Sequence, residues 1–427
     1  MHKGGVEEQS ATERFETLVK KEIVDTRTIP SLREIGELEA ASARDFVDGI
    51  LQYAYLAGTS DIHLDPSETL LTVRFRMDGI LHDVLAVPKK SLPTIVTRIR
   101  VLSELRTDVH QSAQDGRFRV MLGDTPVDVR VSITPTFNGE TVVMRLLVSQ
   151  GRALQLSELG MSKRDQETIE RNMKKSYGML LATGPTGSGK TTSLYSMLQE
   201  LNKRQVSIIT IEDPVEYTIP GLNQIQVNTQ TDLTFASGLR SIVRQDPNII
   251  MVGEIRDQET AGIAVNAALT GHLLLSTLHT NDAAVALPRL VDMGIEPFLI
   301  ASTINVAIGQ RLVRRLCTCA KKRSLTIVER EALKKFAAHG FLAKHKTFAE
   351  PKGCAKCNRS GYHGRIGIYE VLEMTEKIRG LVVRQATADD IRKAAISEGM
   401  TTMLRDGLSK AASGITSIAE VLRVIHG

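Results

Sequence analysis

Residues 184–191 read Gly-Pro-Thr-Gly-Ser-Gly-Lys-Thr, and this glycine-rich run constrains the fold of the chain more than any other segment. It fits the pattern G-x-x-x-x-G-K-[ST] without a mismatch. An apolar run at 179–182 precedes it, as expected for a buried strand, and apolar residues recur at helical spacing after Thr191. A chance glycine-rich turn is the alternative, and the flanking strand and helix patterns argue against it. The order strand, loop, helix predicts a loop that holds phosphate.

The residue types in this loop suit phosphate for separate reasons. Glycines let backbone N–H groups close around phosphate oxygens, and the N-terminus of the following helix adds a partial positive charge. Lys190 can reach the β- and γ-phosphates, and the Thr191 hydroxyl can bind Mg²⁺. The sequence therefore predicts an ATP and Mg²⁺ site made by Gly184, Pro185, Thr186, Gly187, Ser188, Gly189, Lys190, Thr191 and Thr192.

The length, net charge and aromatic content of the chain indicate the number of domains, the cellular location and the kind of partner to expect. A chain of 427 residues predicts two or three domains. No apolar stretch approaches the ~20 residues that span a bilayer, and the N-terminus lacks a signal-peptide core, so we expect a cytoplasmic protein whose membrane contact is peripheral. A net charge of +5 and 4% aromatic residues argue against a nucleic-acid partner.

Patterning along the chain divides it into an arm and two domains. Residues 1–40 form a short charged arm. Residues 41–150 predict a smaller α+β domain with an antiparallel sheet: helices at 41–56 and 92–105, a hairpin at 69–85, and strands at 117–122, 127–134 and 141–147. After a linker at 150–152, residues 151–427 alternate strand and helix to about 310, which predicts an α/β fold with a mostly parallel sheet. Capping residues Thr387 and Ser417 mark a helical C-terminal region at 375–427.

Three further segments carry acidic or histidine side chains next to apolar runs. The first has Glu212, Asp213 and Glu216, the second has Glu254, and the third runs from His272 to His279. Ligands of open α/β sheets bind beyond the carboxyl ends of the strands, so we expect these reactive groups to lie beside the phosphate loop. Helix caps or solvated strand ends are the alternative for any one of them.

The second segment departs from the usual pattern of a nucleotide-binding core. Gly253 precedes Glu254, where an aspartate that binds the metal is common. We therefore expect Thr191 and water molecules to hold Mg²⁺.

Taken together, these motifs resemble the secretion ATPase superfamily, and more closely the motor ATPases of type II secretion and type IV pilus assembly. The similarity runs from about Ala41 to the C-terminus and includes the segments at 60–63 and 115–117 in the first domain. It implies a RecA-like core and a PAS-like first domain. It also implies a homohexamer that binds ATP between subunits and powers assembly of a pilus or pseudopilus through an inner-membrane platform protein.

The resemblance also assigns roles to individual residues. It makes Glu216 the general base, Glu254 the Walker B glutamate and His279 a sensor of the γ-phosphate. It makes Arg130 and Arg145 arginine fingers that reach a neighbouring subunit. The alternating pattern alone reads those two arginines as solvent-facing. Arg240 and Arg244 fit a subunit boundary or a solvated helix face equally well.

The four cysteines of the chain all lie in a segment at 315–365. Cys317-Thr-Cys319 is one residue tighter than ordinary zinc spacing, and Cys354-Ala-Lys-Cys357 matches it. We predict a Zn²⁺ site made by Cys317, Cys319, Cys354 and Cys357, which pins a loop without a core of its own. His339, His345 or His363 could replace Cys319, and a set of free thiols is the alternative. The resemblance agrees, since it implies a four-cysteine element in assembly-type motors.

Two other readings of the function stay open. A nucleic-acid translocase or helicase is compatible with a RecA-like hexamer, and a pilus retraction motor is compatible with the same motifs. The basic run at 311–323 reads as a solvated face or as a contact for acidic loops or anionic lipid.

Overall fold

A computed structural model describes residues 42–148, 154–327, 345–357 and 359–426. The arm at 1–40, the linker at 150–152 and His339 lie outside the described residues. The chain divides into two compact units. Among the described residues, one unit comprises 42–148 with 353–357 and 359–361, and the other comprises 154–327, 345–352 and 362–426.

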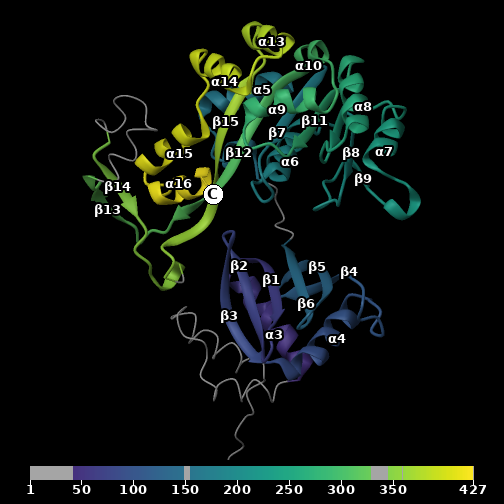
Figure 1. Ribbon diagram of the computed structural model, residues 1–427, viewed down its shortest axis with the longest axis vertical. Coiled ribbons are helices and arrows are strands. Elements are labelled where there is room, and N and C mark those ends of the chain that lie inside the picture. The colour runs from purple at the N-terminus through teal and green to yellow at the C-terminus, as the bar shows by residue number, and fades with distance from the viewer. Residues whose placement is uncertain (1–41, 149–153, 328–344, 358, 427) are drawn as a thin grey trace, which may run out of the picture. The chain divides into compact units, whose positions relative to one another are not determined.

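Within its described residues, the first unit is a six-stranded antiparallel sheet with the α-helices α3 and α4 (Figure 1). The strand order is β3-β2-β1-β6-β5-β4. In chain order the elements are α3 (Ala43–Leu56), β1 (Thr59–Pro66), β2 (Leu70–Met77), β3 (Ile80–Pro88), α4 (Leu92–Leu102), β4 (Gln114–Leu122), β5 (Thr125–Thr136) and β6 (Gly139–Val148). The expected helices and hairpin are present. Strand β1, which sequence patterning left unassigned, lies between β2 and β6 and pairs with both of them.

One face of this sheet is apolar and the other is polar. Alternate residues of β5, from Val127 to Ile133, are fully or almost fully buried and pack in one core with the apolar faces of α3 and α4. The intervening residues face away from that core, because successive side chains of a strand point to opposite sides. Arg130 is one of them, and Arg145 lies directly opposite it on β6.

The second unit contains a seven-stranded sheet with the order β15-β12-β7-β11-β10-β8-β9. Its strands are β7 (Gly178–Thr183), β8 (Ile208–Glu212), β9 (Asn223–Gln226), β10 (Ile249–Val252), β11 (Leu273–Leu278), β12 (Ile304–Leu316) and β15 (Tyr362–Glu373). All neighbours are parallel except β12 and β15. A separate pair, β13 (Lys321–Ser324) and β14 (Thr347–Glu350), lies between β12 and β15 in the sequence.

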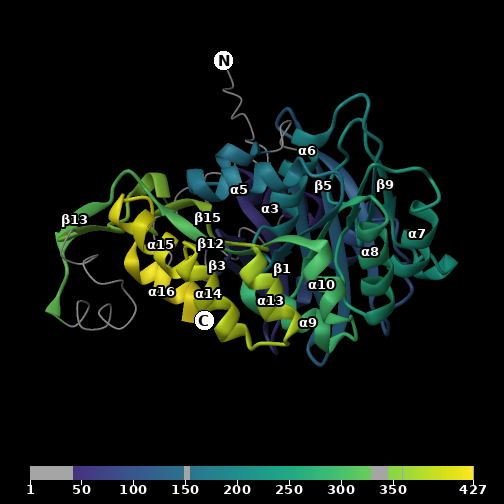
Figure 2. The same ribbon diagram turned by 90° about the horizontal axis from the view of Figure 1, so that it is seen from above.

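Helices cover both faces of this sheet. Its central strands are buried on both sides, which is why they read as continuous apolar runs. Figure 2 shows α5 and α6 on one side and α9, α10 and α13 on the other. The helices are α5 (Lys163–Met173), α6 (Lys190–Leu201), α7 (Phe235–Ile242), α8 (Gln258–Leu269), α9 (Ala283–Asp292), α10 (Pro297–Thr303), α13 (Glu376–Val383), α14 (Ala388–Ser397), α15 (Met403–Ala412) and α16 (Ile418–His426). As expected, Thr387 caps α14 and Ser417 accepts from the backbone of Glu420.

The last two helices, α15 and α16 (yellow in Figure 1), pack against the β12–β15 pair. The Arg311 side chain donates to the Val424 carbonyl at 2.5 Å, and Arg314 forms an ion pair with Glu420 at 2.8 Å. Within the part of the chain that the structure describes, no helix combines the length and the apolar character needed to cross a bilayer.

Candidate active site

The phosphate loop joins the end of β7 to the start of α6. Gly184, Gly187 and Gly189 have φ angles of 148°, 76° and 87°, and Gly189 is the N-cap of α6. A side chain at Gly184 would place its Cβ 2.5 Å from the Gln310 carbonyl oxygen and 2.6 Å from Ser188 Oγ. Glycine is therefore required there both by the backbone conformation and by the lack of space.

Lys190 lies inside the loop that it follows. Its ammonium group donates to the carbonyl oxygens of Gly184 at 2.7 Å and Pro185 at 3.0 Å, and the residue is 9% exposed. Burial lowers the pKa of Lys190, and the charge of Glu254 acts in the opposite direction. The Lys190 ammonium group is thus held by carbonyl oxygens and interacts electrostatically with the Glu254 carboxylate. In this position it can form an ion pair with a phosphate that binds in the loop.

The loop fits a phosphate group for a second reason. Ser188 Oγ is buried within the loop and has no hydrogen-bond partner among the described residues. Buried polar atoms nearly always form a hydrogen bond, so a hydroxyl without one is a candidate to bind a ligand such as phosphate. The N-terminus of a three-turn helix and a buried cation complete an anion site.

Gln310 of β12 supports the loop from behind. Its side-chain amide donates to the Ser188 carbonyl at 2.8 Å, and Gln310 is 1% exposed. The same strand carries Arg311 and Arg314, which hold α16. Nothing in the sequence marks Gln310 as a site residue, because a polar residue in an apolar strand gives no sign of which loop it faces.

Glu254 and His279 meet at the carboxyl ends of β10 and β11. The Glu254 carboxylate lies 2.8 Å from His279 Nε2 and 2.5 Å from an Arg256 guanidinium nitrogen, and Glu254 is 8% exposed. Ser276 and Thr277 of β11 donate to the carbonyls of Val252 and Gly253, which fixes the strand end that carries Glu254. The expected convergence of these segments is therefore present for Glu254 and His279.

His272 does not join them. It precedes β11, so it lies at the opposite end of that strand from His279, and its Nδ1 is 2.9 Å from the Ala267 carbonyl. The expectation that every reactive group of the third segment gathers at the carboxyl edge is thus wrong for His272, because a strand of six residues separates its two ends by about 20 Å.

Glu216 lies on the loop after β8, and its backbone N–H donates to the Tyr195 hydroxyl of α6 at 3.3 Å. The same hydroxyl donates to Glu212 at the end of β8. Tyr195 was not selected from the sequence, because a tyrosine on an apolar helix stripe reads as a core residue.

Arg130 and Arg145 are directly opposite each other on β5 and β6 of the first unit. Arg145 Nε donates to Asp61 of β1 at 2.8 Å, and Arg76 of β2 lies 3.7 Å from the same carboxylate. Burial raises the pKa of Asp61, but hydrogen bonds from Arg145 and Ser60 and the nearby arginine charges bring it below its usual value. Arg117 on β4 extends the row beyond Arg130.

Of the two other arginines singled out from the sequence, Arg240 pairs with Glu259 and Arg244 lies 3.4 Å from Ser241 Oγ. Both are exposed on the second unit, Arg240 on α7 and Arg244 just after its end, and this exposure suits a subunit boundary and a solvated face equally.

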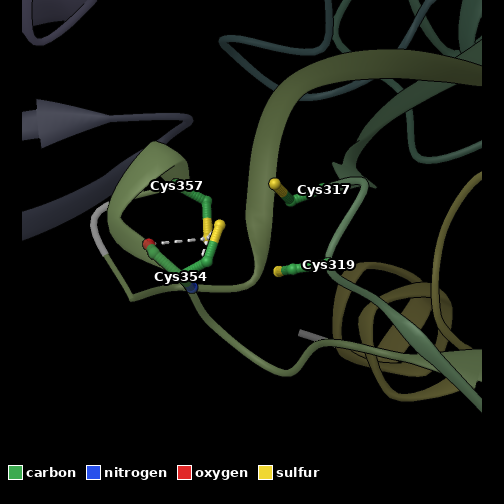
Figure 3. A group of neighbouring side chains, drawn as sticks. All are labelled: Cys317, Cys319, Cys354 and Cys357. Carbon is green, nitrogen blue, oxygen red and sulfur yellow. Dashed lines mark hydrogen bonds between the residues drawn. The ribbon is translucent and has the colours of Figure 1, made fainter.

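The four cysteines come together where the β12–β15 pair ends (Figure 3). Leu316 pairs with Tyr362, so Cys317 and Cys319 leave β12 at the place where the chain enters β15. The four sulfur atoms lie within 4.8 Å of one another, and none is in a disulfide. Backbone N–H groups of Cys354 and Gly361 donate to Cys357 Sγ. Neither His345 nor His363 belongs to this group. Four clustered thiols with N–H donors fit a Zn²⁺ ion, since its structural sites are tetrahedral and thiolate-rich.

Comparison with known proteins agrees with this geometry. The family model described as "Type II/IV secretion system protein" matches residues 37–423. The chain is 45% identical to type II secretion system protein E of Pseudomonas aeruginosa over 397 residues, which are 93% of this chain and 78% of that one. It is 43% identical over 377 residues to the type IV pilus assembly ATPase PilB of Myxococcus xanthus, covering 88% of this chain and 66% of PilB.

Solved structures match the fold over most of the chain. The Legionella pneumophila ATPase DotB has a TM-score of 0.65 at 22% identity, covering 89% of this chain and 95% of DotB. The pilus retraction motor PilT has a TM-score of 0.60 at 24% identity, covering 88% of this chain and 95% of PilT. At these identities the likeness concerns the fold, which is the RecA-like arrangement with a smaller antiparallel domain.

Proposed function

Because the chain belongs to the type II/IV secretion system protein family, we propose that it hydrolyses ATP to power the assembly of a type IV pilus or a type II secretion pseudopilus. In this proposal it is a hexameric motor on the cytoplasmic face of the inner membrane, where it acts through a platform protein. The names of its relatives, a secretion protein E and a pilus assembly ATPase, favour assembly over retraction.

The observation that carries the ATPase proposal is the placement of Lys190. It lies in a glycine cradle at a helix N-terminus, where the charge of the buried carboxylate Glu254 reaches it. Phosphoryl transfer needs little more than positioned cations, a metal ion and a group that orients water. In the proposed site Lys190 holds the β- and γ-phosphates and Thr191 binds Mg²⁺, which neutralises charge on the phosphates when bound.

The remaining roles follow the family resemblance. Glu216 is proposed as the general base, and Glu254 as a second carboxylate that keeps His279 and Arg256 in place. His279 is exposed on one side, which suits a sensor of the γ-phosphate. Arg130 and Arg145 belong to the other compact unit, and we propose that they complete the site of a neighbouring subunit.

A substitution at the loop tests the central claim. Lys190→Ala should lower the rate of ATP hydrolysis by more than about a hundredfold, because one preorganised donor to a developing anion is worth that much. Lys174→Ala, at an exposed lysine of the same unit, is the matched control and should hydrolyse ATP at the normal rate. A Lys190→Ala protein that folds and keeps normal turnover would exclude the assignment.

The cysteine cluster is proposed to hold one Zn²⁺ ion that pins the connection between β12 and β15. Metal analysis of the purified chain should find one zinc per chain. Cys319→Ser should reduce the zinc content, and His363→Ala should leave it unchanged, because His363 lies outside the group of four sulfurs. Zinc retained by Cys319→Ser and lost by His363→Ala would reverse the choice of ligand.

Stimulation by DNA separates this function from nucleic-acid translocation. We expect the ATPase rate to stay the same when DNA is added at low salt, where phosphate-backbone binding is strongest. A rate that rises with DNA and falls again with added salt would favour the translocase instead.

A further inference from the structure

A buried group of polar side chains lies between the helix that follows the phosphate loop and the loop that carries Glu216. At its centre, the Tyr195 hydroxyl of α6 donates to the Glu212 carboxylate at the end of β8. Tyr195 is 0% exposed and Glu212 is 3% exposed. Burying a carboxylate destabilises the folded state unless the carboxylate is hydrogen-bonded. Glu212 therefore requires hydrogen-bond donors around it.

Glu212 is fixed by further donors. The Thr210 hydroxyl donates to its other oxygen at 2.6 Å, and the Gln224 side chain of β9 donates to the same oxygen at 3.2 Å. Gln224 in turn accepts from the Ile219 backbone N–H and donates to the Tyr217 carbonyl. The carboxylate therefore has little freedom to move relative to strands β8 and β9.

The Tyr195 hydroxyl uses its donor on Glu212 and has acceptor capacity left. One acceptor site is taken by the Glu216 backbone N–H at 3.3 Å. Burial and the Glu212 charge raise the pKa of Tyr195, so the hydroxyl keeps its proton at neutral pH and remains a donor to the carboxylate. The ring is held edge-on by Tyr217, with 4.7 Å between the ring centroids.

Besides Glu212, the hydroxyl contacts the Glu216 backbone N–H and, at 3.5 Å, the Gln224 side-chain amide, so it links α6 to the loop that carries Glu216. Lys190 and Thr191 form the first turn of α6, and Tyr195 follows on the same helix. The loop from Asp213 leads to Glu216. A purely structural pair would need only the contact between Tyr195 and Glu212. The additional contact to the Glu216 backbone ties the position of that residue to the helix that carries the phosphate-binding residues.

We propose that Tyr195, anchored by Glu212, is a positioning residue that sets the distance between Glu216 and the phosphate loop. This inference rests on the proposed function, in which Glu216 acts on the water that attacks the γ-phosphate. Tyr195 touches neither nucleotide nor water in this role and acts only through Glu216.

The test is Tyr195→Phe, which removes the hydroxyl and keeps the ring. We expect kcat for ATP hydrolysis to fall about ten- to a hundredfold, because a misplaced reacting group costs that much. The KM for ATP and the binding of a non-hydrolysable analogue should change by less than about twofold, since Lys190 and Thr191 are untouched. Tyr177→Phe, at an exposed tyrosine of the same unit, is the control and should keep the wild-type kcat.

A double variant distinguishes positioning from general weakening. If Tyr195 acts through Glu216, Tyr195→Phe combined with Glu216→Gln should be about as slow as Glu216→Gln alone, because residues that act as a unit are not additive. A further ten- to hundredfold loss in the double variant would overturn the proposal. An unchanged kcat in Tyr195→Phe would also overturn it.

The outcomes separate this inference from the function on which it rests. If Lys190→Ala and Glu216→Gln abolish hydrolysis and Tyr195→Phe does not, only the positioning role fails. If Glu216→Gln hydrolyses ATP normally, the proposed base itself is wrong, and the role of Tyr195 falls with it. Should Tyr195→Phe fail to fold, Glu212→Gln carries the same test, because it weakens the anchor of the hydroxyl but keeps an acceptor for it. Its kcat should then fall with KM unchanged, and a normal kcat would overturn the proposal.

Discussion

The two sheets of this chain place their charged residues in different ways. In the parallel sheet of the second unit, the central strands are buried on both faces, and the candidate carboxylates Glu216 and Glu254 follow the carboxyl ends of β8 and β10. In the antiparallel sheet of the first unit, charges run across an open face, as in the row of Arg76, Asp61, Arg145, Arg130 and Arg117. A site at strand ends can be found from the sequence, because each motif adjoins an apolar run. A site on an open face cannot, since any outward-facing residue of any strand qualifies.

The largest expected loss of ATPase activity comes from substitutions on the open face of the first unit. They test whether that face carries a specific site, as the strand ends of the second unit do. Arg145→Ala and Arg130→Ala should each lower kcat by about a thousandfold and leave analogue binding intact, because arginine fingers act on the transition state. Arg119→Ala is the matched control: it lies on the same sheet, pairs with Asp128 and is exposed. If Arg119→Ala proves as inactive as Arg145→Ala, the face contributes general charge and no specific fingers.

The next effect concerns the strand-end carboxylates. Glu254→Gln should lower kcat by at least about a hundredfold, in the range of a lost acid–base or orienting group, with ATP still bound. Glu167→Gln on the exposed surface of α5 serves as control and should keep the normal rate. Phosphate release measured at saturating ATP decides the matter, and a normal rate in Glu254→Gln would remove this carboxylate from the site.

The smallest expected effect is on the free energy of unfolding. It is tested at one carboxylate from each unit, Glu420 and Asp61. Burial raises the pKa of Glu420, but hydrogen bonds from Arg423 and Arg314 more than offset it and lower the pKa to about 2. A depressed pKa in the folded state gives stability that is complete above the unfolded value of 4.5 and is lost as the pH falls toward about 2. The contribution at neutral pH is no more than about 3 kcal/mol.

Urea unfolding across this acidic range measures the contribution. The difference in free energy of unfolding between the wild type and Glu420→Gln should shrink as the pH drops below about 4.5. Asp61→Asn should show the same direction with a smaller change, because Arg145 and Arg76 are more exposed to solvent and its screening. A difference that does not vary with pH would show that the ion pairs add no stability.

The features that could be predicted from the sequence are those at strand ends, and the features that were missed depend on contacts between distant segments. The phosphate loop, the convergence of Glu254 and His279, and the grouping of four cysteines were all read from short motifs next to strands. Strand β1 was missed because only Ile62 and Leu64 mark its buried face, and its partner β6 lies about eighty residues further along the chain. Tyr195 and Gln310 were missed because their importance depends on hydrogen bonds to segments that lie elsewhere in the sequence.

Strand β12 runs from the phosphate loop to the cysteines, with one irregularity in its pairing with β15 between Arg314 and Leu316. Gln310 holds the loop at one point, and six residues later the strand ends at Leu316, beside Cys317. A paired strand is nearly inextensible, at about 3.3 Å per residue. If the phosphate loop moves and the hydrogen bond between Gln310 and Ser188 stays intact, strand β12 moves with the loop. Helix α16 and the cysteine cluster are attached to the same strand and would be displaced with it. In the proposed motor, the phosphate loop and the far end of the β12–β15 pair would then move together.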